Sequence, residues 1–188
     1  MTFGLTVVGT AVLLWPTVLH TKVTDTVDST AKRALWICVG GLAVIGGATV
    51  LDLRMMFAVG VAVYVVGLGF VAVDGLRHAR RSTQWTFASW SMGAALAWFL
   101  LCTIAFAVVV FQASSWVDAA NGLGYLVAPL TVGFAAQVLL GALSYLLPVV
   151  LGGGPAASRR SAFELNRAAL YRVAVVNLGI VVYLLPAP

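Results

Sequence analysis

Long apolar runs alternate with short polar segments along this chain. Each run is close to or longer than the roughly 20 residues that an α-helix needs to cross the hydrocarbon layer of a membrane. The runs occupy residues 3–19, 34–51, 55–73, 86–112, 126–151 and 168–186. The pattern predicts an all-α fold: a polytopic transmembrane helix bundle of about six spans, organised as a single domain.

Two details refine the predicted spans. Residues 122–151 form an apolar stretch longer than one crossing requires, so we expect the fifth helix to begin near Ala128. Pro129 then falls in its first turn, where the missing N–H breaks no helical hydrogen bond. The first run, 3–19, and the last, 168–186, lie against the two ends of the chain. From this we expect the chain to be a fragment of a larger membrane module, or a short version of one.

Composition supports a membrane environment. Hydrophobic residues make up 62% of the chain and charged residues 9%, too few polar groups to cover the surface of a soluble domain of 188 residues. The net charge of +5 would suggest nucleic acid in a soluble protein, but basic clusters beside apolar spans are better explained as topology signals. The lipid bilayer and other membrane helices are therefore the predicted partners, and nucleic acid is not.

The positions of the basic residues predict an orientation. Ten of the eleven Lys and Arg residues follow spans one, three or five. They are Lys22, Lys32, Arg33, Arg77, Arg80, Arg81, Arg159, Arg160, Arg167 and Arg172. The loops on the opposite side hold Arg54 as their single basic residue. Because cytoplasmic loops are enriched in Lys and Arg, we expect a multi-pass protein of the plasma membrane with these basic loops cytoplasmic and Met1 outside.

Polar residues inside the spans are the candidates for function, since a polar group at membrane depth needs a partner or a water-filled path. Gly133, Gln137, Gly141 and Tyr145 recur every four residues and form one slowly wrapping stripe on the fifth span. The stripe could border a cofactor, with Gln137 and Tyr145 lining the pocket. Close helix packing with Gln137 as an interhelical hydrogen-bonding group is the favoured interpretation. Asn177 in the last span needs a partner that the sequence does not identify.

Two further rows of small residues are predicted to be helix-packing faces. They consist of Gly40, Ala43 and Gly47 on the second span, and Ser89, Gly93 and Ala97 on the fourth.

The sequence gives no catalytic residues and no complete metal site. His20 and His78 both lie at predicted cytoplasmic span ends, so they are not placed to hold a buried metal together. His20 remains a candidate ligand for a haem near that face, against the plainer interpretation of a solvated interfacial side chain. The acidic residues all lie in loops or at span ends, which counts against an ion-driven carrier acting alone.

Several stretches together resemble the membrane region of actinobacterial membrane-bound multicopper oxidases and copper nitrite reductase-like proteins. They are GLTVVGT at 4–10, LWPTVL at 14–19, AQVLLGALSYLLPVV at 136–150, GGGP at 152–155, and the arginine-rich segment before VVN at 175–177. In that family a multi-helix module, itself distantly similar to haem-copper oxidase subunit I and to NnrS-type proteins, precedes cupredoxin domains. The resemblance covers most of this chain but about half of such a module, its C-terminal half.

The resemblance implies an integral membrane module that anchors, or is electronically coupled to, an external copper oxidase or reductase. It would belong to an oxidoreductase complex without being catalytic alone. Haem or copper would reside in the full complex, with a cupredoxin-type copper domain as a partner. Trp15, Pro16, Gln137 and Tyr145 match family positions. Of these, Trp15, Gln137 and Tyr145 are pocket-lining candidates rather than ligands. The alternatives are a small permease or channel-like bundle, with Gln137, Asn177 and kinks at Pro16 and Pro148 along its path, or a purely structural membrane subunit.

Overall fold

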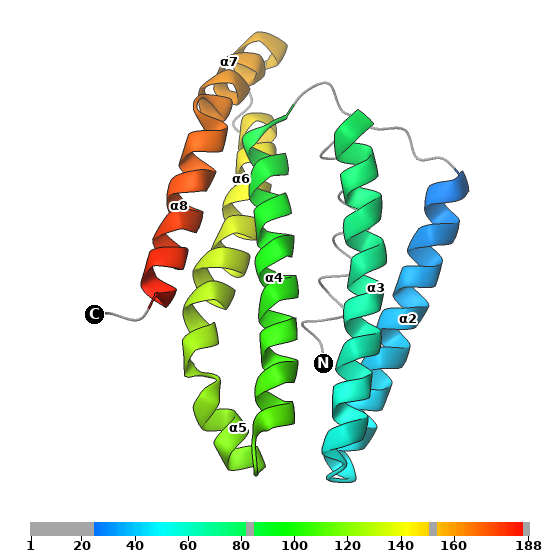
Figure 1. Ribbon diagram of the computed structural model, residues 1–188. Coiled ribbons are helices and arrows are strands. Elements are labelled where there is room, and N and C mark those ends of the chain that lie inside the picture. Colours follow the sequence, from blue (N-terminus) through cyan, green and yellow to red (C-terminus); the bar gives the residue numbers. More distant parts are fainter. Residues whose placement is uncertain (1–24, 82–84, 151–153, 186–188) are drawn as a thin grey trace. The chain divides into compact units, whose positions relative to one another are not determined.

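The computed structural model describes residues 25–81, 85–150 and 154–185, and every element within these ranges is helical. The long helices are α2 (Asp25–Val50), α3 (Arg54–Arg81), α4 (Phe87–Gln112), α6 (Gln137–Val150) and α8 (Ala169–Leu184). Shorter elements join them: α5 (Trp116–Gly122), the 3₁₀ turn η1 (Gly124–Leu126), the π-helix η2 (Pro129–Ala136) and α7 (Gly154–Asn166). Figure 1 shows their order along the chain.

Five helical segments among the described residues are long and apolar enough to cross a membrane. They are Lys32–Val50, Arg54–Arg77, Phe87–Gln112, Pro129–Pro148 and Arg160–Leu184. These segments confirm the membrane-type, all-helical fold and correspond to five of the predicted spans. The remaining predicted span, 3–19, lies outside the described residues, as do Trp15, Pro16 and His20.

Contacts among the residues group into two units. The first unit contains α2, α3, the part of α4 from Leu100 onward, and α5. The second contains α4 as far as Phe99, followed by η2, α6, α7 and α8.

In the first unit, α2 and α3 form an antiparallel hairpin with its turn at Leu51–Leu53 (Figure 1). The buried positions of α2 are Ala34, Cys38, Gly41 and Ala48. Their spacing is that of helices packed at a small crossing angle. A Cβ placed on Gly41 would lie 2.8 Å from the backbone nitrogen of Tyr64 on α3. The two backbones therefore approach so closely that glycine is required there.

The predicted packing row on the second span is wrong for this helix pair. Gly40, Ala43 and Gly47 are exposed, and a Cβ on Gly40 or Gly47 would meet no atom within 4 Å. A row of small residues shows that a close approach is allowed on that face. Which face of a helix is packed depends on its partner. Here α2 packs through the face that contains Gly41, which lies against the glycine-containing face of α3.

The predicted row on the fourth span also differs from the structure. Gly93 has open space at its Cβ position, and Ala97 is exposed. Ser89 is buried for another reason: its hydroxyl accepts the Thr86 N–H at 2.9 Å, and its own N–H bonds to Thr86 Oγ1 at 3.2 Å. This reciprocal cap satisfies N–H groups that the first turn of α4 would leave unpaired.

The turn of the α2–α3 hairpin is joined to the segment between α4 and α5. Arg54 Nη1 donates to the carbonyl oxygen of Ala113 at 2.6 Å, just beyond the last turn of α4. Trp116 Nε1 donates to the carboxylate of Asp52, which occupies a left-handed backbone conformation at φ 56°. Both loops therefore lie at the same end of the first unit, as the predicted topology requires. Arg54, the basic exception to the charge pattern, pairs with a C-terminal helix carbonyl, the position that favours a cation.

The helices α5 and α7 occupy segments that we predicted as loops. Ser115 caps α5 by accepting the Asp118 N–H at 3.1 Å, and α7 begins at Gly154 with Pro155 in its first turn. Both are recognisable helix-start signals, but neither segment is apolar enough to stand out in a search for membrane spans.

Candidate functional site

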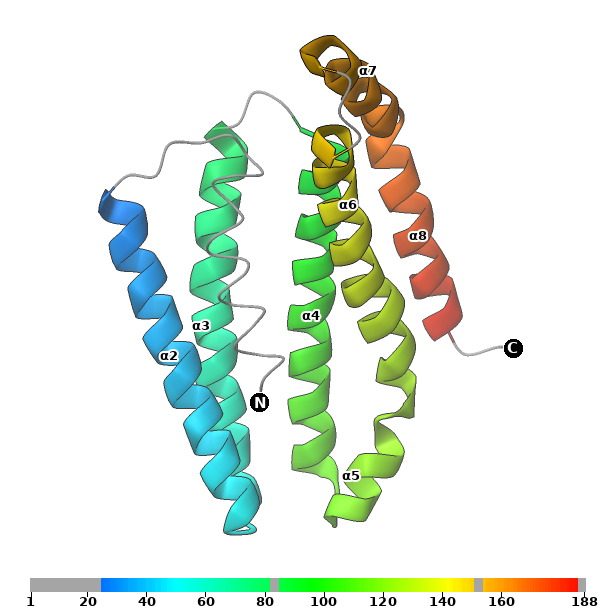
Figure 2. The same cartoon turned by 180° about the vertical axis from the view of Figure 1, so that it is seen from behind.

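The second unit contains a cluster of hydrogen-bonded polar side chains between its helices. The cluster consists of Trp98 on α4, Gln137 at the start of α6 and Asn177 on α8, and we refer to it as the amide cluster. In both ribbon views, α6 lies between the first half of α4 and α8 (Figure 2). Three helices distant in sequence therefore meet at this one point.

Asn177 is the centre of the amide cluster. Its Oδ1 accepts the indole N–H of Trp98 at 2.5 Å and the Gln137 Nε2 at 3.2 Å. Its Nδ2 donates to Gln137 Oε1 at 3.3 Å and to the Val173 carbonyl, one turn earlier on α8, at 2.7 Å. An asparagine side chain offers two acceptor sites and two N–H donors, so all four are in use.

Gln137 is held from a second direction through its backbone. Ser91 on α4 donates its hydroxyl to the Gln137 carbonyl at 2.9 Å. Gln137 and Ser91 are 3% and 1% exposed, so both ends of this bond lie in the protein interior. Since an unpaired polar group in such surroundings costs several kcal/mol, these bonds stabilise the contact between α4 and α6.

The π-helix η2 explains how the predicted stripe on the fifth span stays on one face. A π-turn takes about one residue more per turn than an α-turn, so a step of four residues falls short of a full turn in η2 and overshoots one in α6. The two deviations oppose each other. Gly133, Gln137 and Gly141 are consequently all buried.

The two stripe glycines allow α4 to pack closely on either side of Gln137. A Cβ on Gly133 would lie 2.7 Å from Cγ of Trp98, and one on Gly141 would lie 3.3 Å from Cβ of Ser91. Gly133 thus admits the indole ring that bonds to Asn177. The arrangement matches the packing interpretation of the stripe, in which Gln137 is an interhelical hydrogen-bonding group.

Tyr145, the remaining stripe residue, lies further along α6 and is half-buried. It is not a member of the amide cluster. Trp15 and His20, the other candidate residues from the sequence, fall outside the described residues. Sequence reasoning identified Gln137 and Asn177 separately but missed that they pair.

Trp98 was missed altogether, although a signal for it exists. Tryptophans of membrane proteins are enriched near the ends of spans, whereas Trp98 falls near the middle of Phe87–Gln112. A buried indole N–H ordinarily has a hydrogen-bond partner, and at this depth the partner must be another polar side chain or a freed carbonyl. Asn177 is the matching residue.

A second polar junction lies at the beginning of α4. The Phe87 N–H donates to Asn166 Oδ1 at the end of α7 at 2.7 Å. The Arg172 guanidinium lies 4.8 Å from the centre of the Phe87 ring and donates to the Leu165 carbonyl at 3.2 Å. This junction fixes α7 and the start of α8 against α4. Its hydrogen bonds go to backbone groups at the ends of α4 and α7, so its role is structural.

The amide cluster is neutral, so its chemistry is hydrogen bonding rather than acid–base catalysis. Within the described ranges, no group of three or more His, Cys, Asp or Glu residues is placed to hold a metal ion. Cys38 and Cys102 are buried free thiols.

Comparisons with protein-family models, with curated proteins and with solved structures found no match to this chain. The resemblance to copper-oxidase membrane modules therefore stays a prediction from the sequence motifs.

Proposed function

We propose that this chain is an integral membrane module whose helices form a fixed scaffold, anchoring or electronically coupling an external copper oxidase or reductase. The observation that carries the scaffold part is the amide cluster. Its central residue, Asn177, uses all its hydrogen-bonding groups on Trp98, Gln137 and Val173. The copper partner is supported by the sequence motifs, two of which contain Gln137 and Asn177.

The same geometry argues against a permeation path along the fifth span. A path-lining amide would turn its polar atoms to water or solute, but the Gln137 amide pairs with Asn177 and is 3% exposed. Pro148, the second residue of the fifth span proposed for such a path, is buried within α6.

We further propose that the basic segments face the cytoplasm. In the first unit, the start of α2 and the end of α3 share one end of the hairpin, which carries Arg33 and Arg77. In the second unit, the start of α4, the end of α6 and the start of α8 share one end, beside Arg160 and Arg167 on and after α7. Positively charged helix ends are retained on the cytoplasmic side during insertion.

The redox association is tested on the complex rather than on the isolated chain. The tagged chain is purified from its native membrane in mild detergent with its bound partners, and metals and the reduced-minus-oxidised spectrum are measured. We expect haem or copper in stoichiometric amount with the complex. An intact complex containing neither would remove the redox part of the proposal and leave the scaffold part.

The scaffold role has a separate test. Gln137→Leu together with Asn177→Leu should reduce recovery of the assembled complex, because α4, α6 and α8 lose their shared polar contact. Leu178→Ala, an exposed position next to Asn177, is the control. If the double variant assembles and functions as the wild type does, the amide cluster is not what the scaffold depends on.

A further inference from the structure

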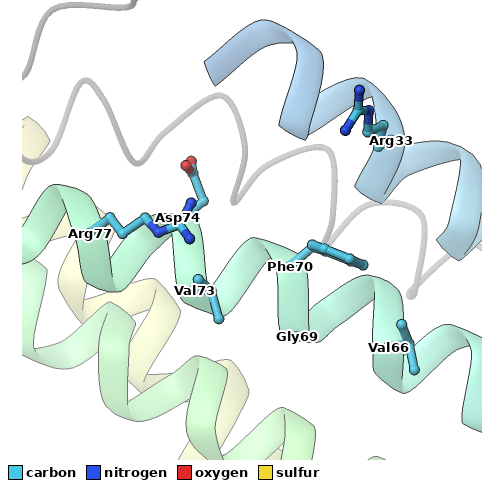
Figure 3. A pocket seen from close by; sticks show the side chains of 7 residues that line it. All are labelled: Arg33, Val66, Gly69, Phe70, Val73, Asp74 and Arg77. Carbon is cyan, nitrogen blue, oxygen red and sulfur yellow. The ribbon is translucent and has the colours of Figure 1, made fainter. Parts of the chain in front are cut away.

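The first unit has a cavity of about 390 Å³ between α2 and α3 that the proposed function does not use. Figure 3 shows the side chains around it, one from α2 and the others along α3. The lining residues are Arg33, Val66, Gly69, Phe70, Val73, Asp74 and Arg77. Their chemistry is divided: one part of the cavity is apolar and another is charged.

The apolar part follows one face of α3. Val66, Phe70 and Val73 recur at helical spacing, and each has about half of its surface exposed, at 55%, 46% and 48%. Gly69 lies between them, and a Cβ at that position would meet no atom within 4 Å. The missing side chain leaves a hollow in a surface that otherwise suits hydrocarbon.

The charged part lies at the ends of two membrane-spanning segments. Arg33 is next to the first residue of Lys32–Val50, and Arg77 is the last residue of Arg54–Arg77. The hairpin is antiparallel (Figure 1), so the start of α2 and the end of α3 lie at the same end of it. Arg33 and Arg77 belong to these two helix ends. With Asp74, the three ionisable side chains among the described lining residues carry one net positive charge.

From this we infer a binding site for an anionic phospholipid, with the headgroup phosphate at Arg33 and Arg77 and an acyl chain along Val66, Phe70 and Val73. A basic pocket between helices at the membrane boundary is the recurring form of such sites. Guanidinium groups bind phosphate oxygens in a fixed, bidentate geometry, whereas a zwitterionic headgroup adds a cation that the arginines repel. The inference requires that the helices lie in a bilayer and is independent of the copper partner.

The test measures phospholipid retained by full-length protein. Purified protein is incubated in mild detergent with phosphatidylglycerol or phosphatidylcholine, and bound lipid is determined by native mass spectrometry over a concentration series. We expect phosphatidylglycerol to bind at one site and phosphatidylcholine to bind more weakly. In Arg33→Gln with Arg77→Gln, the affinity for phosphatidylglycerol should fall by roughly tenfold or more.

A matched control separates the site from general surface charge. Arg160→Gln with Arg167→Gln removes the same charge from exposed positions outside the cavity and should leave the affinity unchanged. Equal loss in both double variants, or equal binding of the two lipids, would overturn the inference. So would wild-type protein that retains no phosphatidylglycerol, as expected if another part of the protein covers the cavity.

A second pair of variants tests the apolar part without altering charge. Gly69→Leu should fill the hollow and weaken phosphatidylglycerol binding severalfold, and the open space at this position lets the helix tolerate the new side chain. Gly179→Leu on α8 is equally unobstructed and lies outside the cavity, so it should bind as the wild type does. Unchanged binding by Gly69→Leu would exclude acyl-chain contact along this face.

Discussion

At the scale of single residues, the side chains of Asn177 and Gln137 differ in the number of groups to which they are hydrogen-bonded. Asn177 hydrogen-bonds to groups on three residues, whereas the side chain of Gln137 bonds to Asn177. When one side chain of a hydrogen-bonded cluster is removed, its former partners are left without a hydrogen bond. The free energy lost in this way exceeds the net contribution of the bond itself. The two residues should therefore differ in mutational sensitivity, although both side chains are amides of similar chemistry.

A double-mutant cycle at these positions tests that inequality. We expect Asn177→Leu to lower the free energy of unfolding by about 1–3 kcal/mol, and Gln137→Leu to lower it by less. The double variant should lose less than the sum, by about 0.6–1.7 kcal/mol, the coupling typical of polar pairs in membrane helices. Unfolding in mixed micelles, followed by circular dichroism, gives these energies. Additive losses would show that the two amides are not coupled.

Asp118, in α5, allows a prediction about pH. The pKa of its carboxyl lies below the ordinary value of 3.8, first because Ser114 donates a hydrogen bond to it and then because of Ser115. The lowered pKa means that the ionised carboxylate stabilises the folded loop. That contribution is complete above 3.8 and is lost as the pH falls through the lower folded-state pKa.

Carboxyl carbon NMR checks this directly. Asp118 should titrate below 3.8 in the wild type, and Ser114→Ala should move the titration back toward that value. Asn121→Ala, in the same short helix, is the control and should leave it in place. An Asp118 pKa that Ser114→Ala does not change would mean that this hydroxyl does not stabilise the carboxylate.

At the scale of helices, the sequence pattern predicted which segments are helical better than it predicted which helix faces are in contact. Apolar length was sufficient for α2, α3, α4 and α8, because a helix is the form in which an isolated segment satisfies its backbone in lipid. The faces used by α2 and α4 were not predictable in this way, since a row such as Gly40, Ala43 and Gly47 is compatible with close packing without requiring it. The π-helix before Gln137 left no recognised signal, and the Gln137–Asn177 pair became apparent once both helices were placed beside α4.

Adjacent glycines in α2 test which face is used. Gly41→Ala would place a Cβ 2.8 Å from a backbone nitrogen of α3, an atom that cannot rotate away. We expect a loss of about 1–3 kcal/mol in the free energy of unfolding. Gly40→Ala, one residue earlier and without a neighbour within 4 Å, should be neutral or stabilising by about 0.5–1 kcal/mol. Similar effects at both positions would contradict the close approach of α2 and α3 at Gly41.

At the scale of the whole molecule, charge and hydrogen bonding divide the helix ends into two kinds. The ends next to Arg33, Arg77 and Arg172 are basic, whereas the hairpin turn and the α4–α5 segment are joined by Asp52, Arg54 and Trp116. Arg54 interacts with a helix carbonyl, so it contributes to a structural contact as well as to the charge count. The asymmetry is the basis for proposing that the basic ends are cytoplasmic.

Single introduced cysteines test this orientation. Glu164→Cys on α7 should be protected from a membrane-impermeant maleimide in intact cells and react after permeabilisation, whereas Asn121→Cys on α5 should react in both. Both positions are exposed, and the native thiols Cys38 and Cys102 are buried, so background labelling should be low. Labelling of Glu164→Cys in intact cells would reverse the orientation. If both cysteines reacted from the same side, the predicted crossing itself would be wrong. The apolar segment between them, Pro129–Pro148, would then not cross the membrane.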